Sequence, residues 1–258
     1  MNRLNSANPT GLNSSGVRTW GMLLLCMGLL GRALIQNHIL NIGQATGQQM
    51  LEVLQSSGDA MLLATCSLVL QAAETCAAPL FCFLLVQGFF KTSNFQNYLL
   101  RVLGLAAVSE IPYNLAFTGR VLDLSSRNPV FGMALCLVVL HFFRRYTGKG
   151  LQNLLIKLAV FVAGMVWAKM LSIDSADCCL VLVTALWACW SKPNFRTLVG
   201  CCAAVVCSLF SPFYLLSPMS FLILHSYNGE KGEENRLFNY LAYPVLLLAV
   251  WGAAMFVA

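Results

Sequence analysis

The chain has 258 residues, of which 58% are hydrophobic and only 10% are charged. Soluble domains carry about 25% charged residues, so this composition excludes a soluble protein and predicts an all-α, polytopic transmembrane helical bundle. The formal net charge of +6 comes from basic residues beside the apolar runs. The positive-inside rule of membrane proteins accounts for basic residues that flank apolar spans. We therefore expect the lipid bilayer as a partner and no nucleic acid.

The N-terminal segment, 1–16, is polar and rich in turn-forming residues, and it is predicted to be disordered. It holds no apolar run of the kind that a cleaved signal peptide needs, so a transmembrane domain is expected over 17–258. About eight or nine spans of about 20 residues each fit this domain. They are predicted at 18–41, 61–90, 97–118, 128–146, 151–171, 174–191, 196–212, 213–227 and 236–257, with an amphipathic interfacial segment at 44–59.

The second predicted span, 61–90, is longer than one upright helix needs. Gln71, Glu74 and Pro79 lie within it, so a break or kink is expected near 74–79. Two architectures stay open, namely one bent span or a span followed by a re-entrant segment, and both give the rest of the chain the same orientation.

The basic residues between spans predict how the chain is oriented. Alternate connections hold Arg3, Arg18, Lys91, Arg144, Arg145, Lys149, Lys192, Arg196, Lys231 and Arg236 on one side, and only Arg120, Arg127 and Lys169 on the other. Cytoplasmic loops carry the excess of lysine and arginine. The sequence therefore predicts a multi-pass protein of the cell membrane with a cytoplasmic N-terminus and a C-terminus on the opposite side.

Polar side chains inside the predicted spans mark candidate sites, because such groups are costly in hydrocarbon. They are Arg32, Glu74, Gln87, Arg101, Glu110, Asn114, His141 and Lys157. Arg32 interrupts the first span, and a structural ion pair with Glu110, or alternatively with Glu74, would neutralise it. Two other roles stay open for Arg32, namely a ligand-facing guanidinium or a side chain that reaches the lipid headgroups.

The eleven cysteines all lie in or beside apolar runs. The pairs Cys178-Cys179 and Cys201-Cys202 lack the spacing of zinc ligands. We expect the cysteines to be small apolar packing residues, with no metal site and no disulfide framework.

Two stretches resemble the TraX family of bacterial membrane proteins. They are "APLFCFLLVQGFFKTSNFQNYLLRVLGLAAVSEIPYNLAF", 78–117, and "YNGEKGEENRLFNYLAYPVLLLAV", 227–250. The family takes its name from a conjugation protein that N-acetylates pilin, and it is grouped with membrane acyltransferases of the acyltransferase-3 type. The resemblance therefore implies transfer of a short acyl group to an unidentified acceptor. Acetyl-CoA or a similar acyl-CoA would be the co-substrate, and no bound cofactor is implied.

The chain departs from the family pattern at polar positions. The family's first span carries an Asp-His pair in a word like "MLIDHIG", and comparison with "MGLLGRALI" puts Gly31 and Arg32 in the places of the acid and the base. Arginine cannot act as a base at neutral pH. Thr75, Gln87, Asn114 and Leu246 also replace an arginine, a glutamate, an acid and a histidine of the family pattern.

These departures leave alternatives open for function, and no catalytic residue is assigned. The first is a working acyltransferase with a remodelled site, whose candidate cavity residues are Arg32, Glu74, Gln87, Glu110, Asn114 and His141. The second is a non-catalytic homologue that acts as a binding or partner subunit. A small transporter or lipid-binding protein is a third. His141 lies near the predicted cytoplasmic end of its span, where a structural role is expected.

Overall fold

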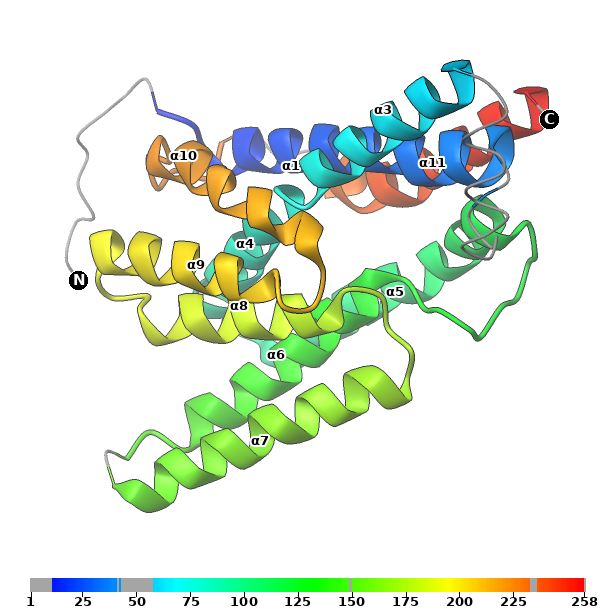
Figure 1. The fold of residues 1–258 in the computed structure, drawn as a ribbon. Helices are drawn as coiled ribbons and strands as arrows, with labels where there is room; N and C mark the ends of the chain where they lie inside the picture. Colours follow the sequence, from blue (N-terminus) through cyan, green and yellow to red (C-terminus); the bar gives the residue numbers. More distant parts are fainter. Residues whose placement is uncertain (1–10, 41, 43–57, 149, 233–235, 258) are drawn as a thin grey trace.

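The computed structural model describes residues 11–40, 42, 58–148, 150–232 and 236–257, without the side chains of 236–239 and 257. In these ranges the chain forms helices joined by short connections and no β-strand, so the all-α prediction is confirmed (Figure 1). The elements are α1 (Ser14–Leu29), the π-helix η1 (Leu30–Ile39), α3 (Gly58–Glu74), α4 (Ala77–Lys91), α5 (Phe95–Thr118), α6 (Pro129–Arg145), α7 (Leu151–Met170), α8 (Ala176–Ala188), α9 (Pro193–Cys207), the 3-10 helix η2 (Pro212–Met219), α10 (Ser220–His225) and α11 (Arg236–Val257).

Several of these helices are apolar and long enough to cross a membrane. Among the described residues they are Ser14–Ile39, Gly58–Lys91, Phe95–Thr118 and Leu151–Met170, and shorter apolar helices cover Ala176–Ala188, Pro193–Cys207, Pro212–His225 and Tyr240–Phe256. Many large apolar side chains face outward, as lipid-facing residues do. The protein is therefore a multi-pass membrane protein.

Two predicted segments differ from the structure, whereas the last predicted span, 236–257, coincides with α11. Within the segment predicted to be disordered, residues 11–16 belong to the fold: the Leu12 N–H donates to the Ser226 carbonyl at 2.8 Å, and α1 begins at Ser14. Residues 1–10 lie outside the described residues, as does most of the predicted interfacial segment 44–59. The predicted span 213–227 is a 3-10 helix followed by a short α-helix.

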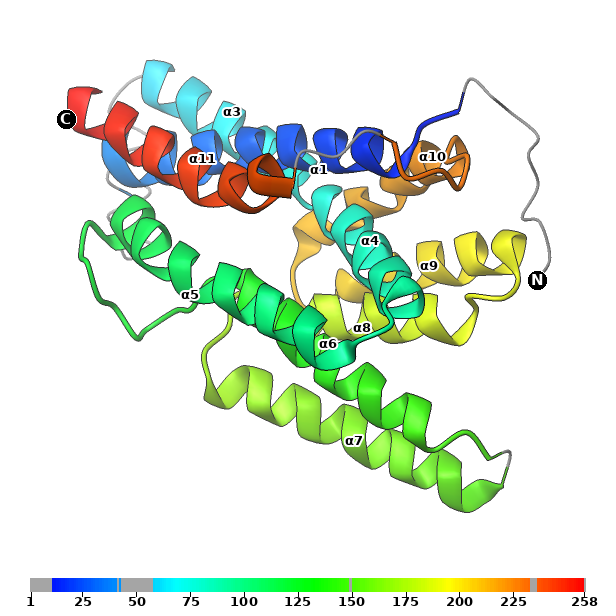
Figure 2. The same cartoon turned by 180° about the vertical axis from the view of Figure 1, so that it is seen from behind.

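The predicted break in 61–90 is confirmed, because α3 ends at Glu74 and α4 begins at Ala77 in a different direction (Figure 2). Pro79 lies in the first turn of α4, where its missing N–H costs no helical hydrogen bond. The Thr75 hydroxyl donates to the Phe213 carbonyl at 3.0 Å, and the Cys76 thiol donates to the Leu216 carbonyl at 3.3 Å. The break is thus held by η2, and it leaves Glu74 at the end of a helix.

The core lies around α8, which is apolar on nearly all sides and packs against α4, α6 and α9. Its largest buried side chains include Leu180, Leu182 and Leu186. Cys178, Cys179 and Cys207 are buried in the same core, and all the cysteines are free. The buried thiols act as packing groups, as the sequence predicts, whereas Cys66 and Cys202 are exposed.

Small residues let α1 and η1 approach α3 closely. A Cβ on Gly28 would overlap the Glu74 side chain, and a Cβ on Gly31 would lie 2.9 Å from the Ser67 carbonyl oxygen. The Ser67 hydroxyl donates to the Gly31 carbonyl at 3.0 Å. This close approach brings Arg32 toward Glu74.

We expect Gly28→Ala to lower stability, because the added methyl group must displace Glu74 where α3 ends. Overpacking of this kind costs about 1–3 kcal/mol. The matched control is Gly104→Ala on α5, since a Cβ there meets open space. Thermal unfolding of both variants in detergent measures the difference, and equal melting temperatures would contradict the packing account.

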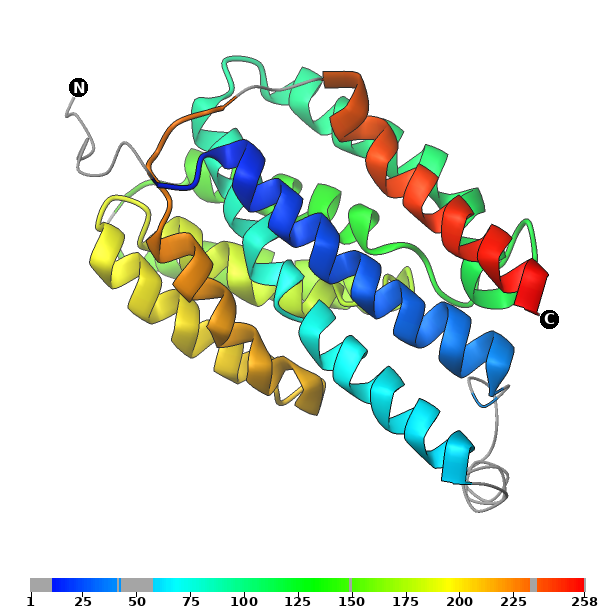
Figure 3. The same ribbon diagram turned by 90° about the horizontal axis from the view of Figure 1, so that it is seen from above.

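With α3 and α4 taken as one crossing, successive crossings alternate in direction, so that the start of α1 and the end of α11 lie at opposite ends of the bundle (Figures 1 and 3). The end that holds the start of α1 also holds the basic residues Lys91, Arg144, Arg145 and Lys192. The other end holds Arg120, Arg127 and Lys169, together with Asp123 and Asp174.

This arrangement supports a topology test. Reporter fusions at Gly148 and at Ala258 are expected to give opposite signals, with Gly148 cytoplasmic, because the positive-inside rule predicts that the basic end faces the cytoplasm. The same signal from both fusions would contradict the alternating arrangement. Opposite signals with Ala258 cytoplasmic would keep the arrangement and reverse the orientation.

Candidate functional site

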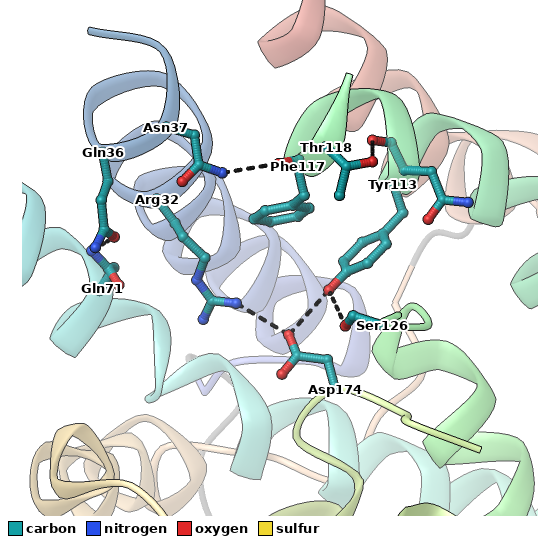
Figure 4. Close-up of a pocket in the computed structure, with 10 residues that line it drawn as sticks. Arg32, Gln36, Asn37, Gln71, Tyr113, Phe117, Thr118, Ser126 and Asp174 are labelled. Atoms are coloured by element: carbon teal, nitrogen blue, oxygen red, sulfur yellow. Dashed lines mark hydrogen bonds and ion pairs between the residues drawn. The ribbon is translucent and has the colours of Figure 1, made fainter. Parts of the chain in front are cut away.

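A polar pocket with a volume of about 340 Å³ lies between η1, α3 and α5 (Figure 4). It is lined by Arg32, Gln36, Asn37, Gln71, Tyr113, Asn114, Phe117, Thr118, Ser126 and Asp174. Thr118 is the last residue of α5, and Ser126 and Asp174 lie in the connections before α6 and α8. Because α1 begins at the opposite end of the bundle, the pocket lies toward the end that is remote from the N-terminus.

Arg32 holds the centre of this site from the π-helix η1. Helices of this kind are rare and are frequent at functional sites. The Arg32 Nη1 donates to Asp174 Oδ2 at 3.1 Å, and its Nη2 lies 3.7 Å from Glu74 Oε2. The guanidinium also lies 5.7 Å from the Phe117 ring centroid. Two carboxylates therefore share one guanidinium, which gives the group the counter-charge that burial requires.

The predicted Arg32–Glu110 pair is wrong. Glu110 Oε2 instead accepts from the Asn128 side chain at 2.7 Å and from its backbone N–H at 3.2 Å. Asn128 is completely buried and also caps α6 by accepting from the Val130 N–H at 3.0 Å. The two Asn128 donors stabilise the Glu110 carboxylate without a cation. Glu110 therefore holds Asn128, and with it the start of α6, against α5. The alternative partner, Glu74, is the one that Arg32 contacts.

Asp174 was missed in the sequence analysis, although an acid in a short connection between two apolar runs was a usable signal. The Tyr113 hydroxyl donates to Asp174 Oδ2 at 3.3 Å, and the Ser175 hydroxyl donates to Oδ1 at 3.2 Å. The Asp174 N–H donates to the Arg127 carbonyl at 3.0 Å, which ties its loop to the connection before α6. Ser175 has a φ of 55°, an uncommon value for a residue other than glycine. These contacts fix the carboxylate beside Arg32.

Side-chain amides line the rest of the pocket. Gln71 Nε2 donates to Gln36 Oε1 at 2.9 Å, and Asn37 Nδ2 donates to the Phe117 carbonyl at 3.2 Å. Asn114 is 2% exposed, and its Nδ2 has no hydrogen-bond partner within the part of the chain that the structure describes. The Asn114 amide nitrogen is therefore buried behind the pocket lining without a partner among the described residues.

Two predicted site residues lie elsewhere. Gln87 accepts from the Ser14 hydroxyl at 3.1 Å and donates to the Tyr227 hydroxyl, so it joins the start of α1 to the segment after α10. His141 is exposed on α6 and stacks on Phe95 with ring centroids 4.3 Å apart. The structure therefore brings Arg32 and Asn114 to the pocket, places Glu74 against Arg32, and leaves Glu110, Gln87 and His141 elsewhere.

Comparison with known proteins agrees with this all-helical membrane fold. The family model described as "TraX protein" matches residues 38–254, which is most of the chain. The chain belongs to the TraX family. The "Probable fimbrial assembly protein FimC, serogroup H1" of Dichelobacter nodosus is 26% identical over 201 residues, covering 69% of this chain and 80% of that protein. No solved structure matches the chain at a significant level.

The family match begins at residue 38, so it includes His38 and leaves out Gly31, Arg32 and Asn37. The family word "MLIDHIG" also fits "LIQNHIL", 34–40, where Asn37 and His38 take the places of the acid and the base. Asn37 lines the pocket, and His38 follows it on η1 without being part of the lining. In this alignment His38 would correspond to the family's histidine, and Asn37 would be the substituted position.

Proposed function

We propose that this TraX protein transfers a short acyl group from an acyl-CoA donor to an acceptor that binds in the pocket, during assembly of surface fimbriae. The observation that carries the proposal is the contact of Arg32 with Asp174 beside a pocket of ligand size. A carboxylate can accept the proton of an attacking amine or hydroxyl, and a guanidinium can stabilise the oxyanion that forms on the acyl carbonyl. The fimbrial context comes from the name of the Dichelobacter nodosus relative.

The position of the pocket fits an acceptor outside the cytoplasm. The predicted orientation puts the basic end of the bundle in the cytoplasm, where acyl-CoA is found, and the pocket toward the other side. For this reaction the thioester carbonyl must extend through the bundle to the pocket. There the amine or hydroxyl of the acceptor attacks the carbonyl, its proton passes to Asp174 or to His38, the acyl C–S bond breaks, and the CoA thiolate leaves toward the cytoplasmic end.

A non-catalytic binding role is the second candidate. It is favoured because no histidine is among the residues that line the pocket, and because Arg32 is already held by two acids. In that case the protein would bind the acceptor or a partner subunit without turnover.

Labelled acetyl-CoA separates the two candidates. Purified protein in detergent is incubated with the donor, and donor binding and thioester cleavage are measured separately. We expect turnover that Asp174→Asn or His38→Ala lowers at least about 100-fold. His141→Ala should retain it, because His141 is exposed on α6 toward the basic end of the bundle, away from η1 and Asp174. Donor binding without any turnover would favour the non-catalytic role, and loss of turnover in His141→Ala alone would contradict the proposed site.

A further inference from the structure

We propose that Arg196, at the basic end of the bundle, anchors the phosphates of the adenine nucleotide that forms part of the acyl-CoA donor. That the nucleotide belongs to an acyl donor rests on the proposed function, whereas the binding of a nucleotide phosphate at this place does not. Arg196 lies in the first turn of α9, at the end of the bundle that holds the start of α1 and is remote from the pocket (Figure 1).

Two aromatic rings hold the Arg196 guanidinium. Its Cζ lies 5.0 Å from the ring centroid of Phe83 and 4.6 Å from that of Trp190. A guanidinium that lies on ring faces keeps its N–H groups free, because these donors point outward in its own plane. Arg196 is partly exposed, so these donors can reach a ligand at the surface. The rings thus fix the orientation of the cation before a ligand binds.

The charges around Arg196 leave room for an anion. Among the described residues no carboxylate forms an ion pair with it, whereas Arg32 contacts two acids. Glu230, an acid at the same end, instead contacts the Asn228 side chain at 3.4 Å. Lys192 lies four residues before Arg196 and adds a second positive charge. A phosphate suits such a site, because its oxygens match the fork of N–H groups on a guanidinium.

An open aromatic surface lies beside this cation and favours a nucleotide over a lipid headgroup. Phe90 stacks on Trp190 with ring centroids 5.3 Å apart and an angle of 15° between the rings. Phe90 is 46% exposed, so a further flat ring can continue the stack. Nucleic-acid bases stack on aromatic side chains in this way. Adenine has such a ring, whereas a phospholipid headgroup offers a phosphate alone.

The length of α8 fits a donor that reaches from this end toward the pocket. The helix begins two residues after Asp174 and ends two residues before Trp190, and its 13 residues span about 20 Å. Coenzyme A carries its thiol at the end of a long pantetheine arm. The nucleotide can therefore stay on Arg196 while the thioester extends toward Arg32 and Asp174.

Direct binding tests the inference. The full-length protein in detergent is titrated with coenzyme A, with ADP and with pantetheine, which lacks the phosphates. We expect saturable binding of coenzyme A and ADP, and binding of pantetheine that is at least about tenfold weaker. No binding of ADP at millimolar concentration, or equal binding of pantetheine and coenzyme A, would overturn the proposal.

Arg196→Gln is expected to weaken the binding of coenzyme A and ADP at least about tenfold, because it removes the charged donors. The matched control is Arg145→Gln, which removes the same charge from an exposed position of α6 at the same end and should bind as the parent does. Equal weakening in the two variants would show unspecific attraction to the basic end and overturn the assignment.

Phe90→Leu tests the stacking surface and leaves Arg196 and both of its rings in place. It should weaken ADP binding about fivefold or more while inorganic pyrophosphate binds as before, because only the base loses a contact. Phosphatidylglycerol added to the micelles should not displace ADP. Displacement by this lipid, together with unchanged ADP binding in Phe90→Leu, would assign the site to a lipid headgroup and overturn the proposal. Melting temperatures of all variants show whether a loss of binding reflects unfolding.

The acyl-transfer assay on the same samples keeps the two proposals apart. Turnover by the parent with a KM for acetyl-CoA that Arg196→Gln leaves unchanged would support the proposed function and contradict this inference. ADP binding that depends on Arg196, in a protein without thioester cleavage, would support this inference and contradict the proposed function.

Discussion

Replacing Arg32 with leucine is expected to destabilise the protein by about 2–3 kcal/mol, which makes it the most destabilising single change in the site. The change leaves Glu74 and Asp174 close together without their shared cation. Removing one member of a fully buried pair costs about 3–5 kcal/mol. We expect less here because the Arg32 side chain is 35% exposed, so water in the pocket screens part of the interaction. Thermal and denaturant unfolding in detergent measure the loss.

Double variants identify the partners. Arg32→Leu combined with Asp174→Asn or with Glu74→Gln should recover part of the lost stability, because each removes one of the uncompensated charges. Arg32→Leu combined with Glu110→Gln should recover none, since Glu110 is held by Asn128. Recovery with Glu110→Gln alone would show that the site is paired as the sequence first suggested and not as the structure has it.

The second large effect concerns turnover and depends on where the family's Asp-His pair belongs. We expect Asn37→Asp to raise acetyl-CoA turnover at least about tenfold. It would add a second carboxylate to the lining of the pocket, where it can accept the proton of the attacking amine or hydroxyl. The change costs one hydrogen bond to the Phe117 carbonyl, or about 0.5–1.5 kcal/mol, so the variant should still fold.

The matched comparison introduces the pair at the other position. Gly31→Asp with Arg32→His should be inactive and unstable, because a Cβ at residue 31 meets the Ser67 carbonyl at 2.9 Å and the cation of the site is removed. Residues that act as a catalytic unit are non-additive, so a pair in the wrong place yields little. Turnover by this variant, together with no gain in Asn37→Asp, would show that the family's Asp-His pair corresponds to residues 31 and 32.

Several features of the fold could be predicted because they depend on the chain alone. The share of apolar residues decides that the protein is a membrane bundle, since backbone groups in lipid must be satisfied within helices. The length of 61–90 and its polar residues predict the break after Glu74, and the structure confirms it. The cost of a charge in an apolar run likewise marks Arg32 as a residue that needs a counter-charge.

The tertiary structure alone decides which groups meet. Burial requires a partner for Arg32 but does not select one, and Asp174 lies 142 residues further along the chain. Its place depends on the pairing of its loop with Arg127, a contact that no local pattern encodes. Glu110 has the expected charge and depth, yet Asn128 donates to it and removes its need for a cation. The amides of the pocket are unremarkable residues on separate helices until η1, α3 and α5 bring them together.

The sequence by itself therefore determined that the membrane contains a charge in need of neutralisation, because that energy depends on one residue and its surroundings. The packing of helices decided the partners and the pocket, because those depend on distances between residues far apart in the chain.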